Sequence, residues 1–360
     1  MPIEFAERIR RIPVYPVAGG YDLGEDIAML ASNESCFAPL GAVVEAAQRV
    51  IAGGNRYPDP SYSVLRGALA DRYGLQPDRI ALGNGSCDIL LAAGEALLEP
   101  GAEVVYAWPS FSVYPHLAAA SGARAIEVPL DADDRHDLDA IASEITVATR
   151  LVLICNPNNP TSTAIGLERV ERFLDGVSPN VCVILDEAYA EFSLALGDPY
   201  ASIELLRRHP NLVLLRTFSK VYGLAGLRVG YALCGSVDFR VAVDQVRQPF
   251  YLGIAAQAAA LEALRHQDEV ERRVERTIAL RLALEETVRG LGVWVAESDA
   301  NFIWLHLPEE AVEEDVVRGL AERRVLVRAG GSLGRDGALR VTVGTEGENE
   351  RFVGALAELL

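Results

Sequence analysis

Three short apolar runs constrain the fold of this 360-residue chain more than any other feature. They are Leu151–Cys155, Val181–Leu185 and Leu212–Leu215. A strand is apolar on both sides only where both faces of its sheet are covered, which is typical of parallel sheets flanked by helices. Helical patterns alternate with such strands from residue 80 to about residue 235. The sequence therefore predicts an α/β domain with a mainly parallel sheet.

The polar stretch after the third run carries the first sign of chemistry. It offers two hydroxyls, Thr217 and Ser219, then Lys220, a glycine-rich turn and Arg228. An amine can form a Schiff base with a carbonyl cofactor, and hydroxyls with a guanidinium can hold a phosphate. The alternative is an ordinary surface lysine in a loop, with Arg228 on a solvated face.

The other two apolar runs also end in polar side chains. Asn159 follows the first run, and Asp186 and Tyr189 follow the second. Open α/β sheets bind ligands at the carboxyl ends of their strands. A carboxylate can keep a pyridine ring protonated, while an amide and a phenol can hold a ring oxygen. The alternatives are a helix cap for Asp186 and a core aromatic for Tyr189.

A glycine turn leads from a short strand into a helix at Gly83-Asn-Gly-Ser-Cys-Asp88. A strand, a glycine turn and a helix N-terminus together gather free backbone N–H groups around an anion. A tight helix entry with Ser86 as the N-cap is compatible with this interpretation.

Composition excludes several classes of protein. The net charge is −18, and no long basic run offers a surface for nucleic acid. The five cysteines lie far apart without a Cys-x-x-Cys pair, so neither a disulfide framework nor a metal site is expected. The N-terminus lacks the apolar core of a signal peptide, and no run approaches the ~20 apolar residues of a membrane span. We expect a cytoplasmic protein that does not bind membranes.

The pattern predicts three regions along the chain. Residues 1–40 form an arm that packs with the C-terminal domain, residues 41–265 form a large cofactor-binding domain, and residues 266–360 form a small α+β domain. The stretch 255–291 reads as long helix, and alternating strands follow it in the small domain.

The motifs together resemble a known family, the fold-type I, class II pyridoxal-phosphate aminotransferases. The resemblance rests on Asn159-Pro-Thr, Asp186-Glu-Ala-Tyr and Ser219-Lys-x-x-Gly-Leu-Ala-Gly-Leu-Arg228. Further motifs in family order include Ser32-Asn-Glu, Asn55-Arg-Tyr-Pro-Asp-Pro and Leu339-Arg-Val-Thr-Val. Within this family the sequence is most similar to the histidinol-phosphate aminotransferases. The resemblance implies fold type I, with a large domain around a mainly parallel sheet and a smaller α+β domain.

The resemblance implies a cofactor site for pyridoxal 5'-phosphate. Lys220 would be the Schiff-base lysine, and Asp186 would pair with the pyridine nitrogen. Asn159 and Tyr189 would bond the ring oxygen of the cofactor, and Phe111 would stack on its ring. The cofactor phosphate would be held by the backbone of Gly85, Ser86 and Cys87 together with Thr217, Ser219 and Arg228. Tyr57 would reach the cofactor phosphate of the other subunit, which implies a homodimer with composite sites.

The resemblance also implies the substrate contacts. Arg340 would bind the substrate α-carboxylate or the equivalent phosphate-bearing end, and Arg328 would bind a distal phosphate. Asn33, Tyr21 and Tyr251 complete the predicted substrate site. Arginine suits both anion-binding roles because its planar fork fits oxyanions in pairs.

The main prediction is transamination between L-histidinol phosphate and 2-oxoglutarate, giving imidazole acetol phosphate and L-glutamate in histidine biosynthesis. The alternatives are an aromatic amino-acid aminotransferase, a phosphothreonine decarboxylase-like lyase and a regulatory module without activity. Four departures from the family fall near substrate-facing segments: Cys36, Ser162, the Pro249-Phe-Tyr-Leu-Gly segment that carries Tyr251, and the arm Val14-Tyr-Pro-Val-Ala-Gly-Gly-Tyr-Asp.

Overall fold

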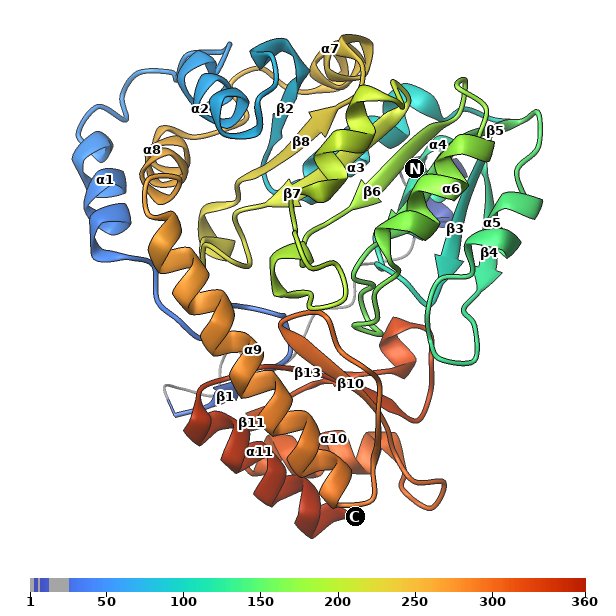
Figure 1. Cartoon of the computed structure of the whole chain (residues 1–360), viewed down its shortest axis with the longest axis vertical. Helices are drawn as coiled ribbons and strands as arrows, with labels where there is room; N and C mark the ends of the chain where they lie inside the picture. The colour runs from blue at the N-terminus through green and yellow to red at the C-terminus, as the bar shows by residue number, and fades with distance from the viewer. Residues whose placement is uncertain (1–2, 6, 13–25) are drawn as a thin grey trace.

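The computed structural model describes residues 3–5, 7–12 and 26–360. Its largest feature is a seven-stranded sheet in the N-terminal two thirds of the chain (Figure 1). The strands follow in spatial order: β2 (Ile80–Gly83), β8 (Gly230–Cys234), β7 (Leu212–Thr217), β6 (Cys182–Asp186), β5 (Thr149–Cys155), β3 (Glu103–Trp108) and β4 (Arg124–Pro129). All neighbouring pairs from β7 to β4 are parallel, and β8 alone runs against its neighbours. The predicted mainly parallel sheet is confirmed.

Helices cover both faces of this sheet, which explains its apolar strands. On β3, Val105 and Ala107 belong to one hydrophobic core, and Val104 and Tyr106 belong to another. The first core is completed by α2 (Ser63–Tyr73), α5 (Leu138–Ser143), α6 (Leu167–Gly176) and α8 (Ile254–Ala263). The second is completed by α3 (Ser86–Leu97), α4 (Tyr114–Ser121) and α7 (Val237–Val246). Helix α1 (Gly41–Ile51) packs beside α8. Side chains alternate across a strand, so each strand feeds both cores.

The C-terminal part builds a second, antiparallel sheet. Its spatial order is β12 (Arg328–Ala329), β13 (Ala338–Thr342), β10 (Phe302–His306) and β9 (Trp294–Val295). A separate parallel pair joins β1 (Ala28–Met29) to β11 (Val325–Leu326), so the start of the described chain lies with this part. Nothing in the strand pairing fixes domain boundaries, and the division at residues 40 and 265 stays a prediction.

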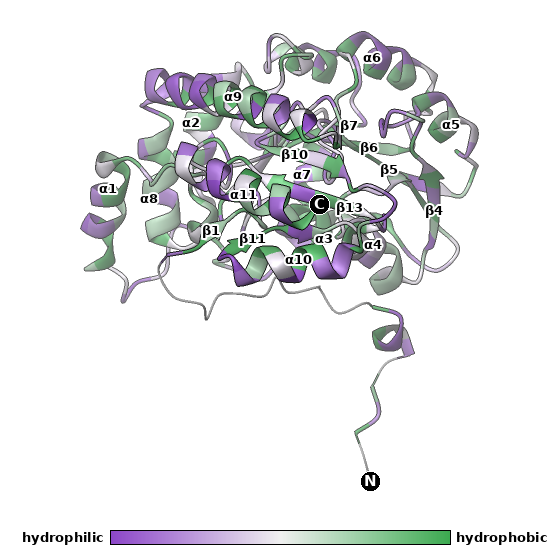
Figure 2. Cartoon of the chain, turned by 90° about the horizontal axis from the view of Figure 1, so that it is seen from below, coloured by the Kyte–Doolittle hydropathy of each residue, from purple (hydrophilic) through white to green (hydrophobic). Residues whose placement is uncertain are grey.

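Three helices pack on this second part: α9 (Gln267–Gly290), α10 (Glu313–Glu322) and α11 (Glu346–Leu359). Their hydrophilic and hydrophobic residues are interleaved in stripes, as in helices that bury one face (Figure 2). None of the helices in the described ranges is long and apolar enough to cross a membrane.

The long helix expected over 255–291 is in fact two helices, α8 and α9. The chain turns at residues 264–266, and the Gln267 side chain donates to the carbonyl oxygens of Leu264 at 3.0 Å and Ala263 at 3.5 Å. A side-chain amide thus satisfies the last carbonyls of α8, which is why no glycine or proline marks the break. The break lets α9 run from the large sheet down to the small one (Figure 1).

Candidate active site

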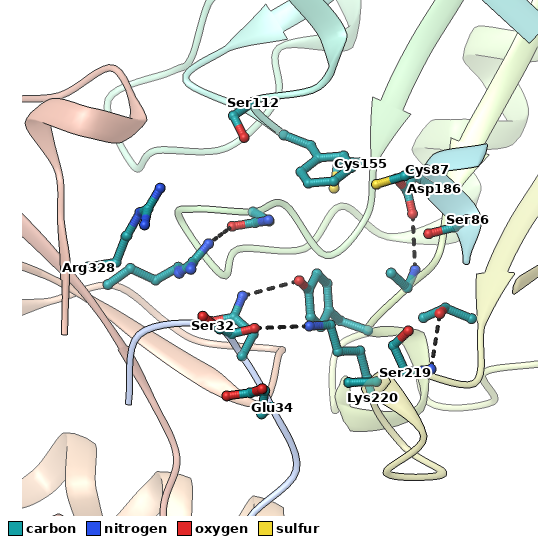
Figure 3. Close-up of a pocket in the computed structure, with 18 of the residues that line it drawn as sticks. Ser32, Glu34, Ser86, Cys87, Ser112, Cys155, Asp186, Ser219, Lys220 and Arg328 are labelled. Atoms are coloured by element: carbon teal, nitrogen blue, oxygen red, sulfur yellow. Dashed lines mark hydrogen bonds between the residues drawn. The ribbon is translucent and has the colours of Figure 1, made fainter. Parts of the chain in front are cut away.

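A cavity of about 430 Å³ opens at the carboxyl ends of β5, β6 and β7, facing the C-terminal sheet (Figure 3). Most of the predicted site residues line it, although they are far apart in sequence. They are Asn33, Ser86, Cys87, Phe111, Asn159, Asp186, Tyr189, Thr217, Ser219, Lys220, Arg228, Arg328 and Arg340. Both the large sheet and the small sheet therefore contribute walls to one cavity.

Lys220 follows β7 and extends its amine into the cavity. Its Nζ donates to the Ser32 carbonyl oxygen at 3.1 Å (Figure 3) and lies 5.8 Å from the centre of the Tyr189 ring. Burial, together with the nearby Arg340 guanidinium, lowers the pKa of Lys220 to about 8. An amine with this pKa has a substantial unprotonated fraction near neutral pH, and the unprotonated form is the nucleophile.

Asp186 ends β6 and is 3% exposed. Its carboxylate accepts from the Tyr114 hydroxyl at 3.2 Å and from the Ala188 backbone N–H at 3.3 Å. Burial raises the pKa of Asp186 to about 7. Both hydrogen-bond partners are neutral, so a protonated ring nitrogen in the cavity would supply the cationic partner that a buried carboxylate requires. Tyr114 was not predicted as a site residue, although it begins α4 only three residues after Phe111.

Helix α3 begins beside the cavity and forms a cradle for an anion. Gly85, the residue before the helix, has φ +79°, and the first N–H groups of α3 make no hydrogen bonds within the helix. Arg228 lies against this turn, and its Nη1 donates to the Ser219 hydroxyl at 3.3 Å. A Cβ on Gly85 would lie 2.4 Å from Arg228 Nη2. The cradle thus combines a helix N-terminus, a hydroxyl and a guanidinium, a donor set that fits a phosphate.

Gly230 is a further residue that the cradle requires and that sequence reasoning missed. A Cβ at this position on β8 would lie 2.3 Å from the Ser86 backbone nitrogen. Only glycine lets the strand come so close to the start of α3. The available signal was a glycine inside an apolar strand, which marks a close backbone approach.

The C-terminal sheet supplies two arginines. Arg328 on β12 and Arg340 on β13 are directly paired across the two strands. Arg340 is 7% exposed, and it donates to Asn159 Oδ1 at 2.6 Å and to the Ala31 carbonyl oxygen at 2.6 Å. Asn33 also lies at this wall, where its Nδ2 donates to the Tyr189 hydroxyl at 3.1 Å. The wall opposite Lys220 is therefore cationic.

Among the predicted residues that the structure describes, the side chains of Tyr57 and Tyr251 do not line the cavity of their own chain. Tyr57 is 81% exposed and stacks on Phe250, with ring centres 4.5 Å apart. Tyr251 does not line this cavity, since its ring packs at 4.8 Å from Tyr62 and under the Arg247 guanidinium at 4.9 Å. Tyr251 is half-buried and packs against the hydrophobic core, and its substrate contact stays a prediction. Tyr21 lies outside the described residues.

Comparisons with known proteins agree on the class of protein. Residues 25–356 match the family model "Aminotransferase class I and II". The relatives named aromatic amino acid aminotransferase include proteins of Streptomyces coelicolor, Cutibacterium acnes and Corynebacterium glutamicum. The Streptomyces protein is 41% identical over 90% of this chain and 88% of its own length. The Cutibacterium protein is 38% identical over 97% of both chains. The Corynebacterium protein is 44% identical over 84% of this chain and 86% of its own length.

Solved structures of the same class also superpose on the chain. A histidinol-phosphate aminotransferase from Sinorhizobium meliloti in complex with pyridoxal-5'-phosphate has a TM-score of 0.88 and 29% identity, over 99% of this chain and 97% of that one. An aspartate aminotransferase from Thermus thermophilus has a TM-score of 0.87 over the full length of both chains; its 24% identity shows the fold alone.

These findings overturn the prediction of a histidinol-phosphate transaminase in histidine biosynthesis. The relatives with 38–44% identity are aromatic amino acid aminotransferases, whereas the histidinol-phosphate enzyme shares only 29%. The motifs behind the prediction surround the cofactor site, which enzymes of this scaffold share. They do not report on the distal end of the substrate.

The cofactor is pyridoxal 5'-phosphate, and the cavity fits it. A buried carboxylate with no cationic partner among the described residues, a lysine with a lowered pKa and an anion cradle at α3 correspond to the ring nitrogen, the aldehyde and the phosphate of this molecule. The fold type I architecture follows from the same family match. The chain belongs to the class I and II aminotransferase family.

Proposed function

We propose that this protein transfers the amino group of aromatic L-amino acids to a 2-oxo acid such as 2-oxoglutarate. The observation that carries the proposal is that Lys220, after β7 of the large sheet, and Arg340, on β13 of the small sheet, line a single cavity. Transamination of an α-amino acid needs a guanidinium that binds its carboxylate while a base lies beside its α-proton. Arg340 and Lys220 offer these two groups. The names of the relatives support an aromatic substrate.

Pyridoxal phosphate, when bound, supplies an aldehyde for covalent attachment and a ring that stores the electron pair left by the α-proton. Lys220 Nζ would hold the cofactor until the amino group of the substrate displaces it, and the freed amine would then accept the α-proton. Asp186 would accept from the ring N–H and keep it protonated, while Asn159 and Tyr189 would hold the ring oxygen. Ser219, Arg228 and the backbone of residues 85–87 hold the phosphate.

The substrate contacts are reassigned under this proposal. Arg340 binds the α-carboxylate, and its bonds to Asn159 and Ala31 fix the direction of its fork. Phe111 and Leu333 give the cavity apolar surface for an aromatic ring. Arg328, beside Arg340, binds the distal carboxylate of the 2-oxo acid rather than a phosphate.

We further propose a homodimer in which Tyr57 contacts the cofactor phosphate of the partner subunit. Tyr57 is exposed and lies outside its own cavity, as such a role requires. The stacked and exposed Tyr57–Phe250 pair presents two aromatic rings on the surface, which suits a subunit interface.

The five cysteines bear on the compartment that we propose, the cytoplasm. All five are free thiols, and Cys155 and Cys234 are buried. Free thiols persist in a reducing compartment. Burial raises the pKa of the Cys155 thiol well above its ordinary value, so it is unreactive.

The test compares amino donors on the purified protein loaded with pyridoxal phosphate. Phenylalanine, tyrosine, tryptophan, histidinol phosphate and O-phosphothreonine are each supplied with 2-oxoglutarate, and both glutamate and CO₂ are measured. We expect kcat/KM for phenylalanine or tyrosine to exceed that for histidinol phosphate by about tenfold or more. CO₂ release that does not depend on 2-oxoglutarate, or a preference for histidinol phosphate, would contradict the proposal.

A further inference from the structure

The loop between β4 and α5 places one carboxylate where the two parts of the protein meet. Asp134 lies in this loop with φ +57°, a left-handed conformation that aspartate tolerates better than most residues, and it is 2% exposed. The loop extends from the large sheet toward the C-terminal sheet (Figure 1).

The Asp134 carboxylate accepts three hydrogen bonds from the C-terminal part. Trp304 Nε1 at 3.1 Å and His306 Nε2 at 2.9 Å both reach Oδ2, and Arg335 Nη1 reaches Oδ1 at 3.0 Å. Burial alone would raise the pKa of Asp134. The hydrogen bonds and charges of His306, Arg335 and Trp304 lower it by more, so the pKa of Asp134 lies below its ordinary value. The carboxylate is therefore ionised and held in a buried position by these three groups.

The groups that Asp134 holds belong to elements that bind substrate. Trp304 on β10 is directly paired with Arg340 on β13. Arg335 closes a turn with Gly330, and Leu333 within this turn lines the cavity. The turn packs tightly on the large domain, since a Cβ on Gly334 would lie 2.7 Å from the Trp108 indole nitrogen.

Asp134 also contacts the cofactor side of the cavity through its backbone. Its carbonyl oxygen accepts from the Thr163 hydroxyl at 2.7 Å. Thr163 belongs to the loop after β5 that carries Asn159, and the Thr163 carbonyl oxygen accepts from the Asn158 N–H at 2.8 Å. One residue thus joins the Asn159 loop to the strands of Arg340 and to the turn of Leu333.

We propose that Asp134 is a positioning residue for transamination: it fixes the C-terminal wall of the substrate cavity, with Leu333 and Arg340, against the cofactor side. Asp134 does not line the cavity and contacts neither substrate nor cofactor. The role rests on the proposed transaminase function, because it presumes a substrate bound between the two walls. Loosening this wall weakens the binding of both the amino acid and the 2-oxo acid, while the chemistry at Lys220 continues once they are bound.

The test is Asp134→Asn in the holoenzyme, since asparagine tolerates the same backbone conformation but presents an N–H₂ group to one of the three donors. The matched control is Asp133→Asn, because the side chain of this neighbour is 75% exposed and forms an ion pair with Arg135 at 3.5 Å. We expect Asp134→Asn to raise KM for phenylalanine and for 2-oxoglutarate by about tenfold, with kcat within about threefold of wild type. The visible absorbance of the bound cofactor stays unchanged, and Asp133→Asn behaves as wild type.

A second variant, Arg335→Gln, keeps the test open if Asp134→Asn folds poorly. Alone, it is expected to raise both KM values by about threefold. In the Asp134→Asn background it is expected to add little, because both substitutions act on the same contact between Asp134 and Arg335. Unchanged KM values in a folded Asp134→Asn, a loss confined to kcat, or an Arg335→Gln enzyme with wild-type KM would overturn the inference. A wild-type protein that transaminates no amino acid would instead overturn the proposed function.

Discussion

Lys220 and Asp186 face one cavity, and burial shifts the pKa of each toward neutrality. The lysine is lowered to about 8 and the aspartate is raised to about 7. Both shifts have desolvation as their first cause, and both favour the uncharged form of the side chain. A cofactor with a cationic ring nitrogen restores the charge of Asp186, so cofactor binding and the ionisation of this residue are coupled.

Replacing Lys220 tests the assignment of the base. Lys220→Ala is expected to lower transamination by about 10³-fold or more, because the attachment point and the proton acceptor are lost together. The visible absorbance of the lysine-bound cofactor is expected to disappear, as a spectrum of the purified variant would show. Turnover near the wild-type rate in this variant would rule out Lys220 as the base.

The raised pKa of Asp186 makes a prediction about stability and pH. Below the ordinary pKa of 3.8 the carboxyl is protonated in the folded and unfolded states alike, so burial carries no ionisation cost. Between pH 3.8 and about 7 the unfolded state loses its proton first, and the stability of the cofactor-free protein falls.

Asp186→Asn removes this ionisation. The free energy of unfolding of Asp186→Asn minus that of wild type is expected to be larger at pH 8 than at pH 5 by on the order of 2 kcal/mol. This figure follows from ~1.4 kcal/mol per pKa unit. Urea unfolding of the two cofactor-free proteins at both pH values measures the change. A stability difference that does not depend on pH would contradict the shift assigned to Asp186. The loaded variant is expected to lose about a hundredfold in kcat, because its ring nitrogen has no ionised partner.

At the scale of elements, the phosphate cradle depends on how closely β8 approaches the start of α3. Gly230→Ala would place a Cβ against the Ser86 backbone and displace the first turn of the helix. We expect the affinity for pyridoxal phosphate to fall by about tenfold or more, since the N–H groups of this turn would no longer converge. Equilibrium dialysis or fluorescence titration with the cofactor gives the dissociation constant.

Gly67→Ala is the matched control for this change. Gly67 lies inside α2, and a Cβ there meets nothing within 4 Å. Alanine is expected to stabilise the helix by roughly 0.5–1 kcal/mol and to leave cofactor affinity unchanged. A loss of affinity for pyridoxal phosphate in both variants would show that any glycine replacement perturbs the site. That result would contradict a specific role for Gly230.

The elements that the sequence predicted well are those with local signals. Apolar runs marked β5, β6 and β7, and the polar residues that end them, Asn159, Asp186 and Lys220, lie together as expected. Contacts between distant segments had no such signal. Tyr114 meets Asp186 across 72 residues and Trp304 meets Asp134 across 170, and no spacing rule connects positions so far apart. Tyr251 lacked such a signal too, because its neighbours in space, Tyr62 and Arg247, set its position outside the cavity.

At the scale of the whole molecule, the cavity draws walls from both sheets of one chain, and the proposed dimer adds Tyr57 from another. A composite site predicts complementation. Mixed dimers of Lys220→Ala and Tyr57→Ala contain one site with both residues intact, so mixing is expected to restore up to about a quarter of wild-type activity at statistical assembly. Activity of the mixture is measured after the subunits are exchanged. No gain over the separate variants, with exchange verified by mass, would contradict the shared site.

Substrate preference is the property that the sequence left least determined. The motifs that marked the family carry the residues expected to hold the cofactor, whereas Leu333 and Phe111, the apolar lining proposed for the ring of the substrate, carry no specificity signal in the sequence. The prediction of histidinol phosphate failed at this point, and the relatives corrected it.

The most direct test of the account is a half-reaction. The cofactor-loaded protein is mixed with L-phenylalanine without any 2-oxo acid, and phenylpyruvate, CO₂ and the visible absorbance are followed together. The account predicts about one phenylpyruvate per active site, no CO₂ and loss of the visible absorbance, followed by its return when 2-oxoglutarate is added. Release of CO₂, or no reaction with phenylalanine while histidinol phosphate reacts to completion, would contradict it.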